Sequence, residues 1–427
     1  MSAKNLNWIA IGTMWALFGM ISFVTNIAAP LGNIWSSQYE WAGMAGNLMN
    51  FAAYLFMGVP AGAMLVRFGY KRTLLMALGV GALGMGTQLL SGYAGADTEV
   101  MQVAGKAVCL NLIIYLLGAL ICGFCVCMLN TCVNPMTNLL GGGGNRGYQL
   151  IQAGGIINSL SGAAAPLAAG ALIGTLTERT TISEVAPICL VALGIFVVAL
   201  VIISFIRIDE PQGNLADEHF EHSPLHFSHF RLGIIAIFCS VGIEVGIPGE
   251  LNAWISHMAG QDGSVMEGSA QVAGTMASIY WIIMMVGRLA ATVLSGRFSP
   301  RAQLSTASIV AIVLLTAALC TEQVTWSIGQ VQLPLSCIFI VLCGLCTAIL
   351  WAAVFNLATE GLGKYTAQAS GIFMTMVVGG GIIPMVQDSV LRPWLGYLES
   401  YLLIIALFVY ILYYSIRGSR IIQHTDD

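Results

Sequence analysis

Apolar stretches of roughly 20 residues, separated by short polar gaps, repeat along the whole chain. A helix needs about 20 apolar residues to cross about 30 Å of hydrocarbon, and lipid offers no partner for an unpaired backbone group. The pattern therefore predicts an all-α integral membrane protein with twelve transmembrane helices. The predicted spans are 8–29, 41–65, 73–93, 108–138, 147–176, 186–207, 232–256, 269–296, 303–321, 332–357, 367–389 and 397–416.

Composition supports a chain that is surrounded by lipid. Apolar residues make up 57% of the 427 positions and charged residues only 8%, whereas a soluble domain carries about 25% charge. The 49 glycines fit the close helix packing found in membranes. We expect the lipid bilayer as a partner and no nucleic acid.

The basic residues predict the orientation of the spans. With the N-terminus inside, the opposite face holds only Lys106, Arg179 and Arg392, and the other loop residues of this kind lie on the cytoplasmic side. The positive-inside rule then places both termini in the cytoplasm. The first apolar run is too long for a cleaved signal peptide, so we expect a multi-pass protein of the cell inner (plasma) membrane.

Two similar halves are indicated by three matches in the same order. The longest polar segment divides the chain into a six-helix bundle at 1–208, a cytoplasmic linker at 209–230 and a six-helix bundle at 231–427. The repeated pieces are Arg67-Phe68-Gly69 with Arg297-Phe298-Ser299, Cys122-Gly123-Phe124-Cys125 with Cys343-Gly344-Leu345-Cys346, and Gly162 to Pro166 with Gly380 to Pro384. Such parallel repeats are the architecture of the major facilitator fold, which places the solute site between the halves.

Several motifs resemble one family. The stretch from Phe355 to Thr366, Ser370-Gly371, and the glycines before Pro384 is similar to the pattern of the fucose–galactose–glucose:proton symporter family, in its glucose/galactose branch. Further matches are Val133-Asn134-Pro135, Asn158-Ser159-Leu160 and Val241-Gly242-Ile243-Glu244-Val245. The resemblance implies secondary transport of a hexose such as glucose, galactose or fucose by alternating access, with protons as a second partner.

The departures from the family pattern bear on proton coupling. Asn26 stands where the family usually has an Asp, and Asn130 where the fucose members have a Glu. An amide can bind a sugar hydroxyl but cannot carry a proton. Val66 replaces the usual Asp of the turn at Arg67, and Gln152 stands near the place of the family's Gln in the fifth span.

Glu244 is the sharpest single signal, because it lies at mid-span with no basic residue in the same span. An ionised carboxylate there costs about 2.5–3.5 kcal/mol on insertion scales. We expect it to bind a substrate hydroxyl, to carry the coupling proton, or to be a structural acid bonded to a neighbouring helix. Glu250, six residues later, is expected to be a solvated acid at the outer interface.

The other candidates are amides and one aromatic ring in apolar spans. For Asn26, Asn130, Asn158, Gln152 and Trp351 the choice is between substrate contact and a helix bridge or packing role. Three further residues complete the set in gating or structural roles: Arg288 in Gly287-Arg288-Leu289, and Arg67 and Arg297 in the repeated turns. Asn134, beside Pro135, is expected to satisfy backbone groups that the proline frees.

Function is predicted to be sugar transport, with two alternatives. One is a facilitator or a carrier of another small polar solute, and the other is a membrane sensor that does not transport. An enzyme is not expected, because the sequence offers no nucleotide loop, no metal-ligand spacing and no large soluble segment. We therefore expect no cofactor, no metal and a monomer.

Overall fold

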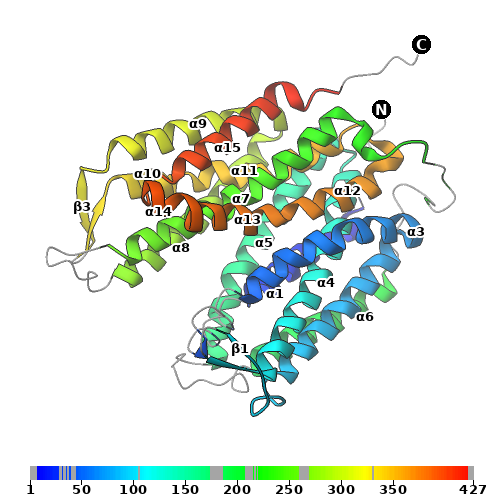
Figure 1. Cartoon of the computed structure of the whole chain (residues 1–427). Helices are drawn as coiled ribbons and strands as arrows, with labels where there is room; N and C mark the ends of the chain where they lie inside the picture. The colour runs from blue at the N-terminus through cyan, green and yellow to red at the C-terminus, as the bar shows by residue number, and fades with distance from the viewer. Residues whose placement is uncertain are drawn as a thin grey trace. The chain divides into compact units, whose positions relative to one another are not determined.

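The computed structural model describes residues 7–27, 31, 35, 38–39, 45–103, 106–173, 186–206, 215, 218, 220–258, 269–328 and 331–421. Most of the N-terminal part is helical, in five long helices (Figure 1). These helices are α1 (Trp8–Asn26), α3 (Ala45–Leu90), α4 (Leu110–Leu140), α5 (Gly144–Ile173) and α6 (Ala186–Phe205).

The C-terminal part is also helical, but its last spans are broken into shorter pieces. The long helices are α7 (Ser228–Ser256), α8 (Ser269–Leu294), α9 (Pro300–Cys320) and α15 (Tyr401–Tyr413). Between and beside them lie η4 (Pro224–His226), α10 (Ser336–Leu342), α11 (Gly344–Thr359), η5 (Gly363–Tyr365), α12 (Thr366–Thr375), η6 (Met376–Val378), α13 (Gly379–Val386), the π-helical turn η7 (Gln387–Leu391), α14 (Arg392–Leu395) and the π-helical turn η8 (Tyr414–Gly418).

The predicted spans are recovered in these helices. Ten described helices have the length and hydropathy of a membrane-spanning segment. The longest, Leu48–Leu90, holds two predicted spans, and α5 corresponds to the remaining one. α3 turns at Gly69, whose φ of 77° lies in the left-handed region that favours glycine. The expected fold class of twelve transmembrane helices is thereby confirmed.

Two short hairpins were not predicted. β1 (Glu99–Val103) pairs with β2 (Lys106–Cys109), and β3 (Thr325–Ile328) with β4 (Val331–Pro334), each antiparallel. The span predicted at 332–357 therefore begins too early, because its first residues pair in β4 and the helix starts at Ser336. Hydropathy alone does not separate a short apolar strand from the end of a span.

The chain forms two compact units. The first consists of residues 1–140, 157–221 and 363–375, and the second of residues 141–156, 222–362 and 376–427. These limits differ from the predicted linker, since part of α5 groups with the second unit and α12 with the first. The division into bundles at 1–208 and 231–427 stays a prediction.

Glycines bring helices together within the first unit. A Cβ on Gly84 of α3 would lie 2.7 Å from the backbone nitrogen of Cys122 in α4. A Cβ on Gly118 of α4 would lie as close to the backbone nitrogen of Gln88. α12 approaches α3 in the same way, at Gly62 and Gly371. Small residues that allow such contact are typical of helix packing in lipid.

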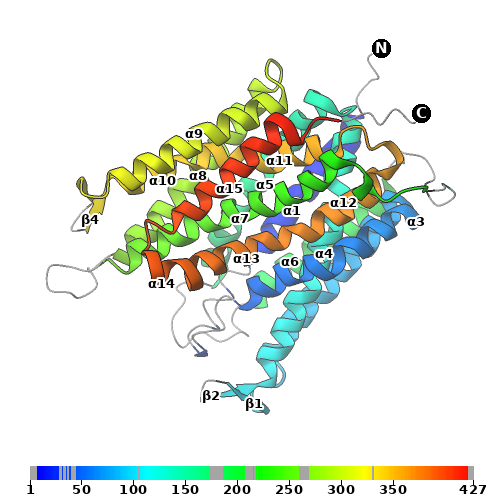
Figure 2. The same cartoon turned by 45° about the horizontal axis from the view of Figure 1, so that its top comes forward.

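The second unit is built around α7, which packs against α8, α11, α13 and α15 (Figures 1 and 2). α8 and α11 meet at Gly287, where a Cβ would lie 2.7 Å from the Ala348 side chain. α9 lies beside α15 in both views. This packing fixes α7 and α8 side by side, and these two helices carry the charged residues of the unit's interior.

Candidate functional site

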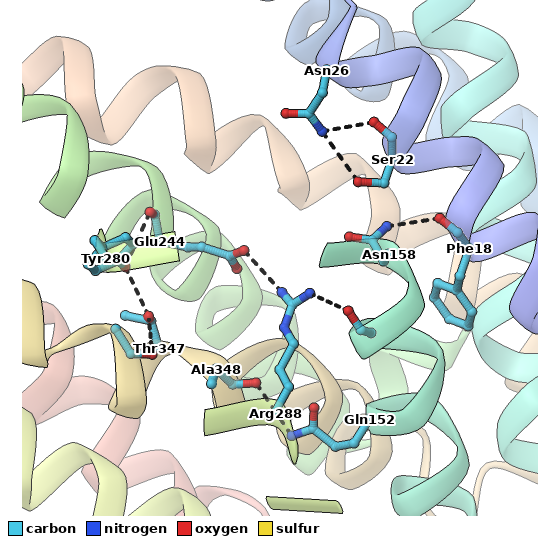
Figure 3. A network of polar contacts seen from close by, with 12 residues as sticks. Phe18, Ser22, Asn26, Gln152, Asn158, Glu244, Tyr280, Arg288, Thr347 and Ala348 are labelled. Atoms are coloured by element: carbon cyan, nitrogen blue, oxygen red, sulfur yellow. Dashed lines mark hydrogen bonds and ion pairs between the residues drawn. The ribbon is translucent and has the colours of Figure 1, made fainter. Parts of the chain in front are cut away.

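The centre of the candidate site is an ion pair between α7 and α8 in the second unit. Nη2 of Arg288 lies 3.3 Å from Oε1 of Glu244, and the two side chains are 10% and 17% exposed. Nη1 of Arg288 donates to the carbonyl oxygen of Gly155 in α5, at 2.8 Å (Figure 3). Each charge inside the span therefore has a partner, which offsets part of the cost of removing it from water.

The backbone of α7 is opened beside Glu244. Pro248 has no N–H, so the carbonyl of Glu244 lacks its normal partner four residues on. The hydroxyl of Tyr280 in α8 lies 3.5 Å from this carbonyl oxygen, and 2.9 Å from the hydroxyl of Thr347 in α11. Three helices thus hold the backbone at Glu244 in one place, and its carboxylate is directed to Arg288 (Figure 3).

Gln152 joins a second set of hydrogen bonds in the same unit. Its Nε2 donates to the hydroxyl of Tyr148 at 2.9 Å and to the carbonyl of Ala348 at 3.4 Å. Tyr148 in turn donates to Oε1 of Gln303 at 3.1 Å. Gln152 is 2% exposed, so both hydrogens of its amide are engaged by protein atoms. Trp351, on α11, is half-buried.

Two of the predicted amides lie on α1 and α5 in the first unit. Asn26 is exposed, and its Nδ2 donates to the carbonyl and the hydroxyl of Ser22 in its own helix, at 2.8 and 3.3 Å. Asn158 is half-buried and donates to the carbonyl of Phe18 at 3.1 Å (Figure 3). Asn26 therefore keeps an accessible amide, whereas Asn158 bridges two helices.

Asn130 and Asn134 form a buried pair on α4. Nδ2 of Asn130 donates to the hydroxyl of Tyr54 in α3 at 2.9 Å, and Nδ2 of Asn134 lies 3.2 Å from Oδ1 of Asn130. The two side chains are 8% and 0% exposed. The oxygen and the nitrogen of the Asn130 amide thus both have protein partners in this structure.

The carbonyl that Pro135 frees belongs to Thr131, and it has a partner on another helix. The hydroxyl of Ser370 in α12 donates to this oxygen at 2.9 Å. The sequence assigned this role to Asn134, which instead donates to the carbonyl of Asn130 at 3.0 Å. Ser370 fills the role because α12 packs on α4 within the first unit, a contact that residue spacing does not reveal.

The arginines of the two repeated turns are exposed and lie outside the helix packing. The guanidinium of Arg67 lies over the ring of Phe68, at 5.3 Å. Arg297 is exposed, but Arg301 in the same turn donates to the hydroxyl and the carbonyl of Ser419 at 3.0 Å each. The second turn is thus tied to the C-terminal end of the described chain through Arg301, which sequence reasoning did not single out.

The expectation for Glu250 is wrong. Its side chain is 3% exposed, and its Oε1 lies 3.8 Å from Nη1 of Arg392. The partner follows it by 142 positions in the sequence, so no local pattern marks the pair. The sequence also missed Tyr280 and Tyr54, and the only signal for them was a hydroxyl within an apolar span, where it usually finds a partner.

Comparisons with known proteins agree with this architecture. Residues 7–384 match the profile of the Major Facilitator Superfamily. The chain is similar to the glucose/galactose transporter of Brucella abortus biovar 1 (strain 9-941), at 28% identity over 98% of this chain and 96% of that protein. It is also similar to the L-fucose-proton symporter of Escherichia coli (strain K12), at 23% identity over 88% of this chain and 86% of that one.

A solved structure shares the fold. The crystal structure of a variant of the E. coli fucose:proton symporter covers 96% of this chain, and 99% of that chain is covered, with a TM-score of 0.79 and 18% identity. The resemblance expected from the motifs, to the fucose–galactose–glucose:proton symporter family and its glucose/galactose branch, is confirmed by these relatives. The chain belongs to the major facilitator superfamily.

Proposed function

We propose that this protein moves a monosaccharide, a hexose such as glucose, galactose or fucose, across the membrane by alternating access. The observation that carries the proposal is the half-buried carboxylate of Glu244, held by Arg288 inside two membrane spans. A charged pair in lipid is costly unless it serves an ion or solute pathway. The choice of a sugar is supported by the similarity, over 98% of the chain, to a protein named glucose/galactose transporter.

Glu244 is the proton-coupling residue in this proposal. A proton on its carboxylate removes the negative charge and ends the ion pair, while Arg288 keeps its bond to the carbonyl of Gly155. The protonated acid is then a hydrogen-bond donor as well as an acceptor, and both suit a sugar hydroxyl. Proton binding and sugar binding are thereby linked at one side chain, as symport requires.

The remaining candidates fall into two groups by what their polar atoms already do. The exposed amide of Asn26 and the half-buried ring of Trp351 are proposed as direct sugar contacts. Asn130, Asn158 and Gln152 bind sugar only if they exchange the protein partners described above. Arg288 is proposed as a gating residue, and Asn134, Arg67 and Arg297 as structural ones.

A second candidate is a facilitator without proton coupling. The observation that favours it is the pair of amides, Asn26 and Asn130, at positions where the family usually has acids. In that case Glu244 stays ionised and only positions the solute. A carrier of a different small polar solute, or a sensor that binds without transport, are the other readings that the experiment below separates.

The setting proposed for this activity is the inner (plasma) membrane. Both termini lie in the cytoplasm, as the distribution of basic residues predicts. The functional unit is a monomer of two six-helix bundles, 1–208 and 231–427, joined by the linker 209–230, and the solute site lies between the bundles.

The test is uptake of a panel of labelled hexoses into proteoliposomes, with and without an inward proton gradient. Accumulation of one sugar in the wild type and its loss in Glu244→Gln are expected. Glu322→Gln, an exposed acid after α9, is the matched control and should accumulate sugar normally. Equilibration without accumulation in the wild type would favour the facilitator, and no uptake of any hexose would contradict the sugar assignment.

A further inference from the structure

A second cluster of charges lies at the C-terminal end of α7, apart from the pair at Glu244. Glu250 is held inside the second unit with only 3% of its side chain exposed. The guanidinium of Arg392, at the start of α14, is 3.8 Å away, which is too far for a hydrogen bond. The same nitrogen of Arg392 forms a much closer ion pair with Asp388 in η7, whose side chain is 49% exposed. Arg392 thus serves Asp388 first.

Two buried oxygen atoms in this region lack a hydrogen-bond donor among the described residues. One is Oε1 of Glu250, and the other is Oε1 of Gln387. Gln387 is 0% exposed, and its Oε1 would lie 2.9 Å from a Cβ on Gly246. Gly246 precedes Glu250 by one helical turn, so the two side chains follow the same face of α7.

The orientation of the Gln387 amide is fixed by its neighbours. Its nitrogen contacts the hydroxyl of Ser400 at 3.1 Å. That hydroxyl donates its hydrogen to the carbonyl of Tyr397, at 2.7 Å. Ser400 must therefore accept from Gln387, which requires the nitrogen of the amide to face Ser400 and its oxygen to face α7. The region has two acceptors and no donor, and an unsatisfied buried polar atom costs about 1–3 kcal/mol.

The charges of the cluster do not balance when both acids are ionised. Glu250 and Asp388 carry two negative charges, and Arg392 carries one positive charge. The other titratable groups facing this region are neutral in their ordinary forms, namely Tyr280 on α8, Cys337 on α10, Tyr401 on α15, Tyr397, and His257 at the end of α7, which stacks on Tyr397. A buried site with one excess negative charge favours the uptake of a cation.

We propose that Glu250 is a second proton-binding residue, separate from Glu244, in which a proton from solvent supplies the charge and the hydrogen-bond donor that the cluster lacks. Protonation brings the net charge of Glu250, Asp388 and Arg392 to zero. It leaves Arg392 paired with Asp388 and gives the Glu250 carboxyl an O–H to donate. The protonated form is therefore the one that this packing stabilises.

The consequence for transport rests on the proposed function. An acid that is buried here when protonated, and exposed when ionised, favours whichever conformation buries it as the pH falls. Glu250 would then set the pH range over which the protein works, without touching the solute.

The test measures proton binding directly and needs no sugar. Infrared difference spectra of the full-length protein in nanodiscs, recorded between alkaline and acid pH, should contain the carbonyl band of a buried protonated carboxylic acid. Glu250→Gln should remove this band, whereas Glu244→Gln should leave it in place. Retention of the band in Glu250→Gln would overturn the proposal. Because the band does not depend on cargo, it distinguishes failure of this proposal from failure of the sugar assignment.

Two substitutions of neighbouring charges test the cause, and they keep the proposal testable if Glu250→Gln does not fold. Asp388→Asn removes the like charge and should lower the pH midpoint of the band by about one unit. Arg392→Gln removes the opposite charge and should raise the midpoint by about one unit or more. Midpoints that move in the other directions, or not at all, would contradict the charge argument. A midpoint that falls when choline is replaced by sodium would assign the site to sodium and overturn proton binding.

Discussion

Two acids on one helix have opposite surroundings, although each lies beside an arginine. Glu244 and Arg288 form a balanced pair, and Arg288 turns its second nitrogen to the carbonyl of Gly155. Glu250 shares Arg392 with Asp388 and has an oxygen without a donor among the described residues. The difference teaches that burial near an arginine does not define a role. The number of charges and the number of donors decide whether a proton is expected at rest.

The largest expected effect comes from removing the arginine of the balanced pair. Arg288→Met leaves Glu244 ionised and buried without its partner, and should lower the free energy of unfolding by about 3–5 kcal/mol. Thermal unfolding in detergent measures the change. The double variant with Glu244→Gln should recover most of the loss, because no buried charge remains. If the double variant is no more stable than Arg288→Met, the pair is not the source of the stability.

The same substitution in the outer cluster should have a smaller effect. Arg392 is 26% exposed, and its distance to Glu250 is longer. A protonated Glu250 needs no counter-charge, so Arg392→Met should cost less than Arg288→Met in the same unfolding assay. Equal losses in the two variants would remove the distinction between the clusters.

Two glycines offer a matched test of how tightly each cluster is packed. A Cβ on Gly246 would lie 2.9 Å from Oε1 of Gln387, which Ser400 holds in place. Gly246→Ala should therefore cost about 1–3 kcal/mol of stability through overpacking. A Cβ on Gly155 would lie 3.4 Å from Cδ of Arg288, an ordinary contact.

Gly155→Ala is therefore the control for Gly246→Ala. It should be neutral, or should stabilise α5 by up to about 1 kcal/mol, because alanine loses less backbone entropy in a helix. Unfolding midpoints of the two variants give the comparison. A loss of stability in Gly155→Ala similar to that in Gly246→Ala would mean that Arg288 has no room to move.

The smallest effect is expected from Asp388→Asn. Its carboxylate is 49% exposed, and exposed ion pairs contribute about 0–1 kcal/mol. The substitution also frees Arg392 for Glu250, which offsets the loss. The unfolding midpoint at neutral pH should change by less than that of any variant above, and a large loss would show that Asp388 is the main anchor of Arg392.

Much of the fold follows from the sequence because lipid leaves few options. Each apolar run of about 20 residues has to be a helix, and the turn at Gly69 separates two of them within α3. The hairpins are the exception. Thr325–Ile328 and Val331–Pro334 are apolar enough to be read as the edge of a span, and only their pairing makes them strands.

The candidate site was predictable only in part. Glu244 is visible because a lone acid in an apolar run is costly. Its partners are not visible, because Arg288 and Gly155 come from other helices and their approach depends on packing. Glu250 looked like an interfacial acid because Pro248 and Gly249 suggested the end of a helix. α7 in fact continues to Ser256, and this continuation buries the side chain.

The most direct test of the account compares Glu244→Gln with Glu250→Gln in proteoliposomes that hold the same amount of folded protein. Sugar counterflow and gradient-driven accumulation are measured across a range of pH. Glu244→Gln should keep counterflow and lose accumulation, because the coupling proton has no carrier. Glu250→Gln should accumulate sugar with a flattened dependence on pH. Full accumulation by Glu244→Gln would contradict the assignment of Glu244 as the coupling residue.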